Sequence, residues 1–117
     1  MGRSRRARVD SRGALVTRGE VWWAEHPETG RRPFLILTRE IPIPVLQRVV
    51  VVPATRRIRG IPSEVVLTEE DGMPESCVLS FDNVTTLPKT LLTERICRLG
   101  LDRLAESCVA LRHATGC

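Results

Sequence analysis

The sequence predicts a mainly β domain: a small antiparallel barrel with a helix at its C-terminal end. The chain has 117 residues, the length of one domain, and 42% of them are apolar. Thirteen valines and only 3% aromatic residues indicate an aliphatic core built on strands. Short apolar segments follow one another with turn residues between them, and this spacing is typical of antiparallel sheets.

About seven short strands are expected before the helix. Residues 49–52 are four consecutive valines and form the strongest strand, with Pro53 ending its ladder or marking a bulge. The Ile-Pro-Ile-Pro segment at 41–44 cannot be a central strand, so a loop or an edge is expected there. The acidic segment 69–72 is expected to be a turn. The other strands are expected at residues 20–24, 33–38, 63–67, 77–81, 84–87 and 95–99.

The last segment of the chain has a helical period. Apolar residues recur there every three or four positions, which predicts a helix with one buried face. Asp102 is the expected N-cap, and Gly116 lies just past the expected end. The expected buried stripe contains Leu101, Leu104, Ala105, Cys108, Val109 and Leu111.

The net positive charge of the chain comes from its N-terminal segment, because the rest of the chain is nearly neutral. Residues 1–18 contain six arginines and one aspartate, and the formal net charge of the chain is +4 at pH 7. Residues 1–17 show no periodicity and are expected to be a disordered basic leader, followed by one folded domain over residues 18–117. Such a leader attracts nucleic acid or an acidic membrane surface without specificity.

Several classes of protein are disfavoured. The sequence has no apolar run of about 18 residues, and its arginine-rich start lacks the apolar core of a secretory signal. A cytoplasmic protein with reduced cysteines and no membrane partner is therefore expected. The four cysteines form no C-x-x-C pair, and neither a phosphate loop nor an H-E-x-x-H motif is present, so neither a metal nor a cofactor is expected.

Two arginine clusters at strand ends suggest a binding site. Arg31 and Arg32 precede an apolar strand, while Arg56 and Arg57 follow the valine strand, with Arg59 close behind. A guanidinium donates to two phosphate oxygens at once, so such clusters suit a phosphate backbone, although solvated loop arginines give the same pattern.

These clusters belong to a series of short motifs that follow one another along the chain. The motifs are Arg-Gly-Glu-Val-Trp at 18–22, Arg-Pro at 32–33, Val-Pro-Ala-Thr at 52–55, Asp-Asn at 82–83 and Leu-Gly-Leu at 99–101. Over about residues 18–113 this series resembles the MazF/PemK family of toxin endoribonucleases. The resemblance implies an SH3-like barrel of the CcdB/PemK type that forms a homodimer.

The same resemblance implies a function and a site. The family's members cleave single-stranded RNA at short sequences without metal, as toxins of type II toxin–antitoxin systems that a cognate antitoxin neutralises. Arg32 and Thr55 match the family's catalytic arginine and threonine, and Arg31, Arg56, Arg57 and Arg59 are expected to hold the RNA backbone. Asp82 and Asn83 match an acidic–amide pair at the RNA groove. His26 and Glu28 have no firm match and are candidates for the RNA site and for proton transfer.

The chemistry of such a cleavage agrees with these residue types. The 2′-OH of the RNA attacks its own phosphate, so the protein has to align that hydroxyl and stabilise charge on the phosphorane. A guanidinium and a hydroxyl can stabilise that charge. Arginine, with a pKa above about 12, is a poor acid or base, so the general acid and base stay unassigned.

The residues also allow other interpretations. CcdB toxins share the barrel but bind and poison DNA gyrase, and a non-catalytic barrel would bind RNA in a salt-sensitive manner without forming product. Thr55 could be a β-branched residue at a strand end, and residues 82–83 could be a hairpin turn. Trp22 and Trp23 alternate between faces, so one is expected in the core while the other stacks a base or packs in a dimer.

Overall fold

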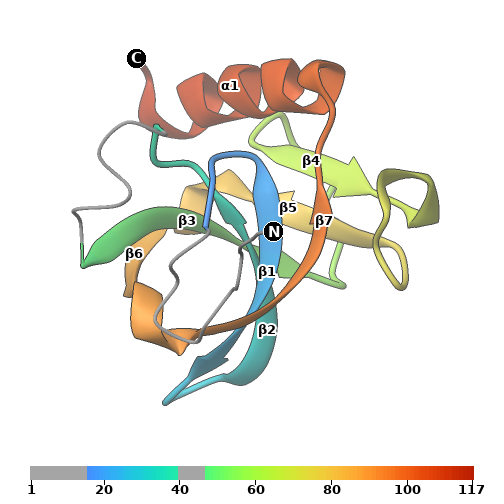
Figure 1. Ribbon diagram of the computed structural model, residues 1–117. Coiled ribbons are helices and arrows are strands. Elements are labelled where there is room, and N and C mark those ends of the chain that lie inside the picture. The colour runs from blue at the N-terminus through green and yellow to red at the C-terminus, as the bar shows by residue number, and fades with distance from the viewer. Residues whose placement is uncertain (1–15, 40–46) are drawn as a thin grey trace.

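The computed structural model describes residues 16–39 and 47–117, and within them seven strands form one antiparallel sheet. The sheet curls into a barrel-like shape, and the single helix α1 (Leu101–Thr115) lies across one end of it (Figure 1). The expected fold class is therefore confirmed. The strands are β1 (Glu20–His26), β2 (Gly30–Ile36), β3 (Arg48–Thr55), β4 (Glu64–Leu67), β5 (Cys77–Ser80), β6 (Thr85–Pro88) and β7 (Leu92–Arg98).

Six strands follow one another in the order β4-β5-β3-β2-β1-β7. The remaining strand, β6, pairs with β3. Three short 3₁₀ turns, η2 (Glu69–Asp71), η3 (Phe81–Asn83) and η4 (Lys89–Leu91), join its later elements. On one edge of β3, β6 pairs up to Val51 and β5 pairs from Ala54 onward. Pro53 lies between these two ladders, where a missing N–H costs little, so the strand continues through it to Thr55.

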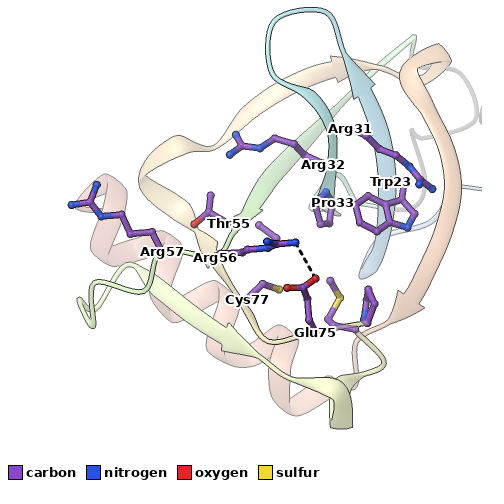
Figure 2. A pocket seen from close by; sticks show the side chains of 12 residues that line it. Trp23, Arg31, Arg32, Pro33, Thr55, Arg56, Arg57, Glu75 and Cys77 are labelled. Atoms are coloured by element: carbon purple, nitrogen blue, oxygen red, sulfur yellow. Dashed lines mark hydrogen bonds and ion pairs between the residues drawn. The ribbon is translucent and has the colours of Figure 1, made fainter.

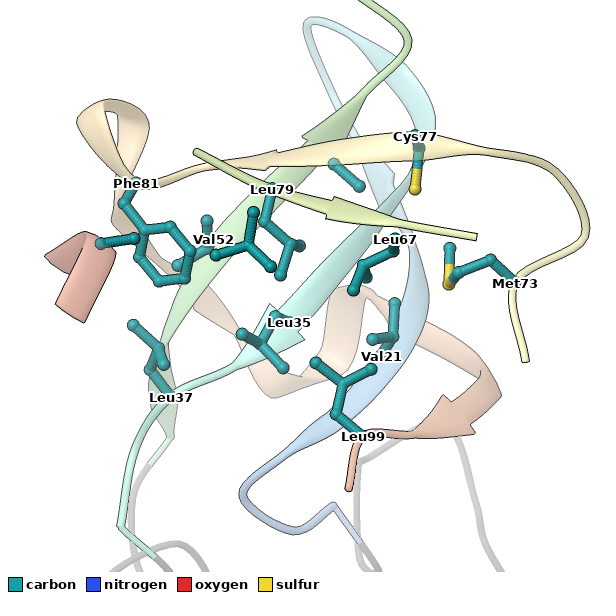
Figure 3. Close-up of a cluster of buried hydrophobic side chains, with 13 residues drawn as sticks. Val21, Leu35, Leu37, Val52, Leu67, Met73, Cys77, Leu79, Phe81 and Leu99 are labelled. Atoms are coloured by element: carbon teal, nitrogen blue, oxygen red, sulfur yellow. The ribbon is translucent and has the colours of Figure 1, made fainter. Parts of the chain in front are cut away.

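Two apolar clusters fill the fold because successive residues of a strand point to opposite faces. Val21 and Leu35 belong to the first cluster, which Figure 3 shows beneath β4 and β5. Their neighbours Trp22 and Phe34 belong to the second cluster. Val16, at the end of the expected leader, is also buried in the second cluster. Residues 1–15 and the segment 41–44 lie outside the described residues.

Some strand bounds differ from the expected ones in a way that matters for the site. β2 begins at Gly30, whose φ of +78° closes the hairpin with β1, so Arg31 and Arg32 lie within the strand rather than before it. Glu25 and Ala24 are their cross-strand neighbours on β1. The last expected strand also begins earlier, at the start of β7, and the expected strand 77–81 ends one residue sooner because η3 follows.

The helix begins one residue earlier than its expected N-cap. Gly100 is the N-cap, and Asp102 lies in the first turn, so the assignment of Asp102 as N-cap is wrong. In the first turn a negative charge is still favoured by the positive end of the helix dipole. Gly116 ends the helix in the left-handed conformation and donates its N–H to the Arg112 carbonyl oxygen, which confirms the expected end.

The expected buried stripe of the helix is wrong in its position. Leu101 is 84% exposed and Val109 is 45% exposed, whereas Ser107 and Ala110 are buried. The Ser107 hydroxyl donates to the Arg103 carbonyl oxygen at 2.9 Å, so a polar side chain can occupy the buried face. Of the other expected members, Ala105 and Cys108 are exposed, and Leu104 and Leu111 are half-buried against the first cluster.

Candidate active site

A cavity of about 470 Å³ opens where the start of β2, the end of β3 and the segment before β5 approach one another. Figure 2 shows the side chains that line it, with Arg32 and Thr55 coming from β2 and β3. Its polar lining consists of Arg31, Arg32, Thr55, Arg56, Arg57 and Glu75. Four arginines and one threonine hydroxyl in the same lining make this cavity suited to an anion with several oxygen atoms.

The pairing of β2 with β3 places Arg32 near Thr55. Phe34 lies opposite Pro53 and Leu35 opposite Val52 in the antiparallel ladder. Continuing this register two residues past Phe34 brings Arg32 to the level of Thr55, and both side chains line the cavity. Two residues that are 23 positions apart in the sequence thus reach one site because the strands are in register.

The arginines of the cavity differ in how far their charge is already satisfied. Among the described residues, no hydrogen bond or ion pair involves the Arg32 or Arg57 guanidinium. Arg56 donates to Glu75 at 3.0 Å, but both side chains are more than half exposed. An exposed ion pair of this kind contributes about 0–1 kcal/mol, so Arg56 can exchange it for a phosphate oxygen.

Arg31 is held differently. Its guanidinium lies 4.4 Å from the centroid of the Trp23 ring, a cation–π contact. It also forms ion pairs with Glu94 of β7 at 3.2 Å and with Glu25 of β1 at 3.7 Å. These two carboxylates compensate the charge of Arg31, whereas Arg32 next to it has no described partner.

Five of the expected site residues do not line the cavity. The His26 ring accepts a hydrogen bond at Nδ1 from the backbone N–H of Glu28 at 3.1 Å, which ties together the turn between β1 and β2. The backbone N–H of Arg59, in the β3–β4 loop, donates to Glu64 at 3.0 Å.

The other two of these five residues lie in η3, at the opposite end of β5 from the cavity. There the Asp82 carboxylate accepts a hydrogen bond from the Ser63 hydroxyl at 2.6 Å. The Asn83 amide donates to the Ser80 hydroxyl at 3.0 Å. In the described fold both side chains therefore hold η3 against neighbouring segments rather than pointing to Arg32.

Two residues of the cavity had no signal in the sequence. Glu75 and Cys77 enter it because the pairing of β5 with the end of β3 brings their segment there. Burial raises the pKa of the Cys77 thiol, and the negative charges of Glu75 and Asp71 raise it further. The thiol is therefore protonated and is no nucleophile at neutral pH.

Two further observations concern the described residues as a whole. Within residues 16–39 and 47–117, no three His, Cys, Asp or Glu side chains gather into a group that could hold a metal ion. In the same part of the chain, no helix has the length and apolar character needed to span a membrane.

The fold and cavity define a small barrel-like protein with a cationic site at one end of its sheet. Comparison with known families shows that the chain belongs to the PemK-like, MazF-like toxins of type II toxin–antitoxin systems, whose model matches residues 17–115. This confirms the family resemblance of the sequence.

Relatives in Mycobacterium tuberculosis align over most of the chain. "Probable endoribonuclease MazF2" is 48% identical over 103 residues, which are 87% of this chain and 100% of the relative. "Probable endoribonuclease MazF5" is 43% identical over 105 residues, which are 89% of this chain and 96% of the relative.

Solved structures support the fold. An endoribonuclease in complex with its cognate antitoxin, from a mycobacterial species, has a TM-score of 0.78 at 25% identity and covers 87% of this chain and 96% of its own. The M. tuberculosis toxin MazF-mt6 has a TM-score of 0.77 at 32% identity, covering 83% and 96%.

Proposed function

We propose that this protein is the toxin of a type II toxin–antitoxin pair and a metal-independent, sequence-specific endoribonuclease acting on single-stranded RNA in the cytoplasm. The observation that carries the proposal is the meeting of Arg32 and Thr55 at one cationic cavity. The aligned relatives carry the name "probable endoribonuclease", which supports the same reaction. The catalytic domain is the barrel of residues 18–117.

The reaction uses a nucleophile that the substrate supplies. The 2′-oxygen forms a bond to the adjacent phosphorus, and the bond from phosphorus to the 5′-oxygen breaks. The products are a 2′,3′-cyclic phosphate and a 5′-hydroxyl, and the proton lost by the 2′-OH balances the one gained by the leaving oxygen.

The protein stabilises the charge that accumulates on the phosphorane. The Arg32 guanidinium donates to its non-bridging oxygens, and it can do so because no described carboxylate already occupies it. The Thr55 hydroxyl donates from the neighbouring strand and fixes the orientation of the same phosphate. Removing one preorganised donor of this kind typically lowers the rate about 10²- to 10³-fold.

The surrounding residues hold the rest of the RNA. Arg56 and Arg57 lie next to Thr55 in the cavity and contact the flanking phosphates, which gives binding a strong dependence on salt. An RNA strand longer than the cavity passes over the surface around it. The remaining candidate contacts there are Arg31, Arg59, His26, Glu28, Asp82 and Asn83.

We also propose an antitoxin partner and a homodimer. Solved relatives include an endoribonuclease with its cognate antitoxin and MazE–MazF complexes from Deinococcus radiodurans. An acidic antitoxin segment would complement the unpaired Arg32 and Arg57 and compete with RNA for them. Leu101 and Val109 on α1 leave apolar surface that a second copy would bury.

Light scattering of the purified toxin, alone and with its antitoxin, tests the stoichiometry of both assemblies. The gyrase-binding alternative has no need of an Arg32–Thr55 pair, and the aligned relatives are named endoribonucleases.

Cleavage of a long single-stranded RNA in EDTA tests the proposed reaction. The wild-type protein should give discrete fragments that end in 2′,3′-cyclic phosphate and 5′-hydroxyl groups, and sequencing their ends reads out the preferred site. Arg32→Ala should form the same fragments about 10²- to 10³-fold more slowly under the same conditions. Folded wild-type protein that leaves RNA intact, or fragments with 3′-hydroxyl ends, would contradict the proposal.

A further inference from the structure

The cavity has an apolar half that the cleavage chemistry does not use. Trp23, Pro33, Ala54, Met73 and Pro74 line it, next to the cationic residues around Thr55. Figure 2 shows Trp23 beside Pro33, its cross-strand partner, with Arg57 at the other side of the cavity. A nucleotide has the same two parts, an anionic phosphate and a flat base that stacks on apolar and aromatic surfaces.

The two tryptophans have different surroundings. Trp22 is only 1% exposed, and its indole N–H donates to Glu20 at 2.9 Å, so packing and a hydrogen bond both fix it in the second cluster. Trp23 is half-buried and belongs to neither apolar cluster. No described hydrogen bond involves its indole N–H. Its large ring is therefore a wall of the cavity rather than part of the interior.

Arg31 extends the flat surface of Trp23. Its guanidinium lies over the ring, and Glu25 and Glu94 hold it from the two neighbouring strands. Because these carboxylates already compensate its charge, Arg31 has less to gain from a phosphate than Arg32 does. A guanidinium plane and an indole are both surfaces on which unpaired RNA bases stack.

We propose that the apolar half of this cavity is a nucleobase subsite, in which one unpaired base stacks on the Trp23–Arg31 pair while Arg32 contacts the adjacent phosphate. The inference rests on the proposed function, since it takes RNA as the substrate. The volume of about 470 Å³ lies within the range of about 300–1,000 Å³ for small-molecule pockets, which leaves room for one nucleotide. Trp23 then contributes to the choice of cleavage site.

Binding of uncleavable RNA tests the subsite separately from catalysis. The probes are a 2′-O-methyl oligoribonucleotide of mixed sequence, which lacks the attacking hydroxyl, and an abasic oligomer of the same length. Trp23→Ala should weaken binding of the base-carrying probe about 5- to 150-fold, as the loss of one base–aromatic stack does, and should leave binding of the abasic probe unchanged. Trp23→Phe should retain most of the affinity, because a smaller aromatic ring still stacks.

The tryptophan emission gives a second readout that needs no loss of affinity. The base-carrying probe should quench the emission of the wild-type protein, the abasic probe should not, and the quenching should disappear in Trp23→Phe, where only the buried Trp22 remains. Arg57→Ala is the matched control, because loss of a phosphate contact should weaken binding of both probes equally.

Three results would overturn the subsite: equal weakening of both probes by Trp23→Ala, no weakening of either, or quenching that persists in Trp23→Phe. If Trp23→Ala weakens binding of an antitoxin peptide but leaves binding of RNA unchanged, the nucleobase subsite is also overturned, and the apolar half is a protein-docking surface instead. If the wild-type protein shows base-dependent quenching but cleaves no RNA, the endoribonuclease proposal fails while the stacking site stands.

Discussion

Arg103 and Arg32 are the same residue type in opposite settings. Arg103, on α1, donates to both carboxylate oxygens of Asp71, at 2.9 and 3.3 Å, and also to Glu106 at 3.0 Å. Arg32, on β2, lies in the cavity with no described ion pair or hydrogen bond of its guanidinium. The first arginine joins α1 to η2, and the second is left free to bind an anion.

The Asp71 carboxylate accepts hydrogen bonds from two Arg103 nitrogens and from the backbone N–H of Thr68. Thr68 and Asp71 form a capping box at η2, so the carboxylate accepts a backbone N–H as well as the Arg103 guanidinium. Burial opposes ionisation of Asp71, but the hydrogen bonds from Arg103 and Thr68 outweigh it and lower its pKa. Asp71 and Glu106 already occupy the Arg103 guanidinium, whereas no described carboxylate occupies that of Arg32, and this difference separates the structural arginine from the one proposed to act on the phosphate.

The largest expected effect is on activity. Arg32→Ala should slow RNA cleavage about 10²- to 10³-fold, since it removes a donor to the charged transition state. Its free energy of unfolding should change by less than about 0.5 kcal/mol, because the side chain has no described partner to lose. Single-turnover cleavage and urea unfolding measure the two quantities. A large loss of stability would show that Arg32 is structural after all.

For Arg103 the expected effect is on stability and not on activity. Arg103→Ala should lower the free energy of unfolding by about 1–3 kcal/mol, because it leaves the largely buried Asp71 carboxylate without its charged partner. The rate of cleavage by the folded variant should stay that of the wild type. Glu106→Ala is the matched control, since it removes only an exposed partner and should cost less than about 1 kcal/mol. A cleavage defect in folded Arg103→Ala would show that Arg103 contributes to the reaction as well as to stability.

A pH dependence should follow from the lowered pKa of Asp71. A carboxyl whose pKa is depressed by folding stabilises the native state above its unfolded pKa of 3.8, and this stabilisation is lost as the pH falls through the folded pKa. Unfolding free energies measured between about pH 5 and pH 2 should therefore fall less steeply for Asp71→Asn than for the wild type. Parallel curves for the two proteins would contradict this role.

The smallest expected effect concerns Arg57, the other cavity arginine with no described partner. Arg57→Ala should weaken RNA binding roughly equally for all sequences. The slope of log K against log salt concentration should become shallower by about one, as the loss of one phosphate contact does. Fluorescence anisotropy over a series of salt concentrations measures that slope. An unchanged slope would mean that Arg57 contacts no phosphate.

Much of the fold could be predicted from local sequence pattern, because short valine-rich segments and turn residues mark strands without tertiary information. The face of α1 could not be predicted in this way. Ser107 is buried through a hydrogen bond to its own helix, while the strongly apolar Leu101 is exposed. A hydrophobic pattern describes which residues favour burial, but the packing against η3 and β4 decides which ones are buried.

The candidate site also contains residues that local sequence motifs predict and residues that depend on tertiary contacts. That Arg32 and Thr55 line one cavity could be predicted, because both belong to the short motifs that carry the family resemblance. The presence of Glu75 in the cavity could not be predicted, since it depends on the pairing of β5 with β3. The role of Arg31 could not be predicted either, since it depends on carboxylates from β1 and β7. The resemblance places Asp82 and Asn83 at the RNA groove, yet their side chains are hydrogen-bonded to Ser63 and Ser80 away from the cavity.

A double-mutant cycle on RNA cleavage tests most directly whether Arg32 and Thr55 act on the same phosphate. Single-turnover rates are measured for the wild type, Arg32→Ala, Thr55→Ala and the double variant on one RNA at saturating protein. If the two side chains act on the same phosphate, the double variant should be about as slow as the slower single variant, as in other groups that act as a unit. Losses that multiply, or a single variant that cleaves at the wild-type rate, would show that Arg32 and Thr55 do not form one reactive centre.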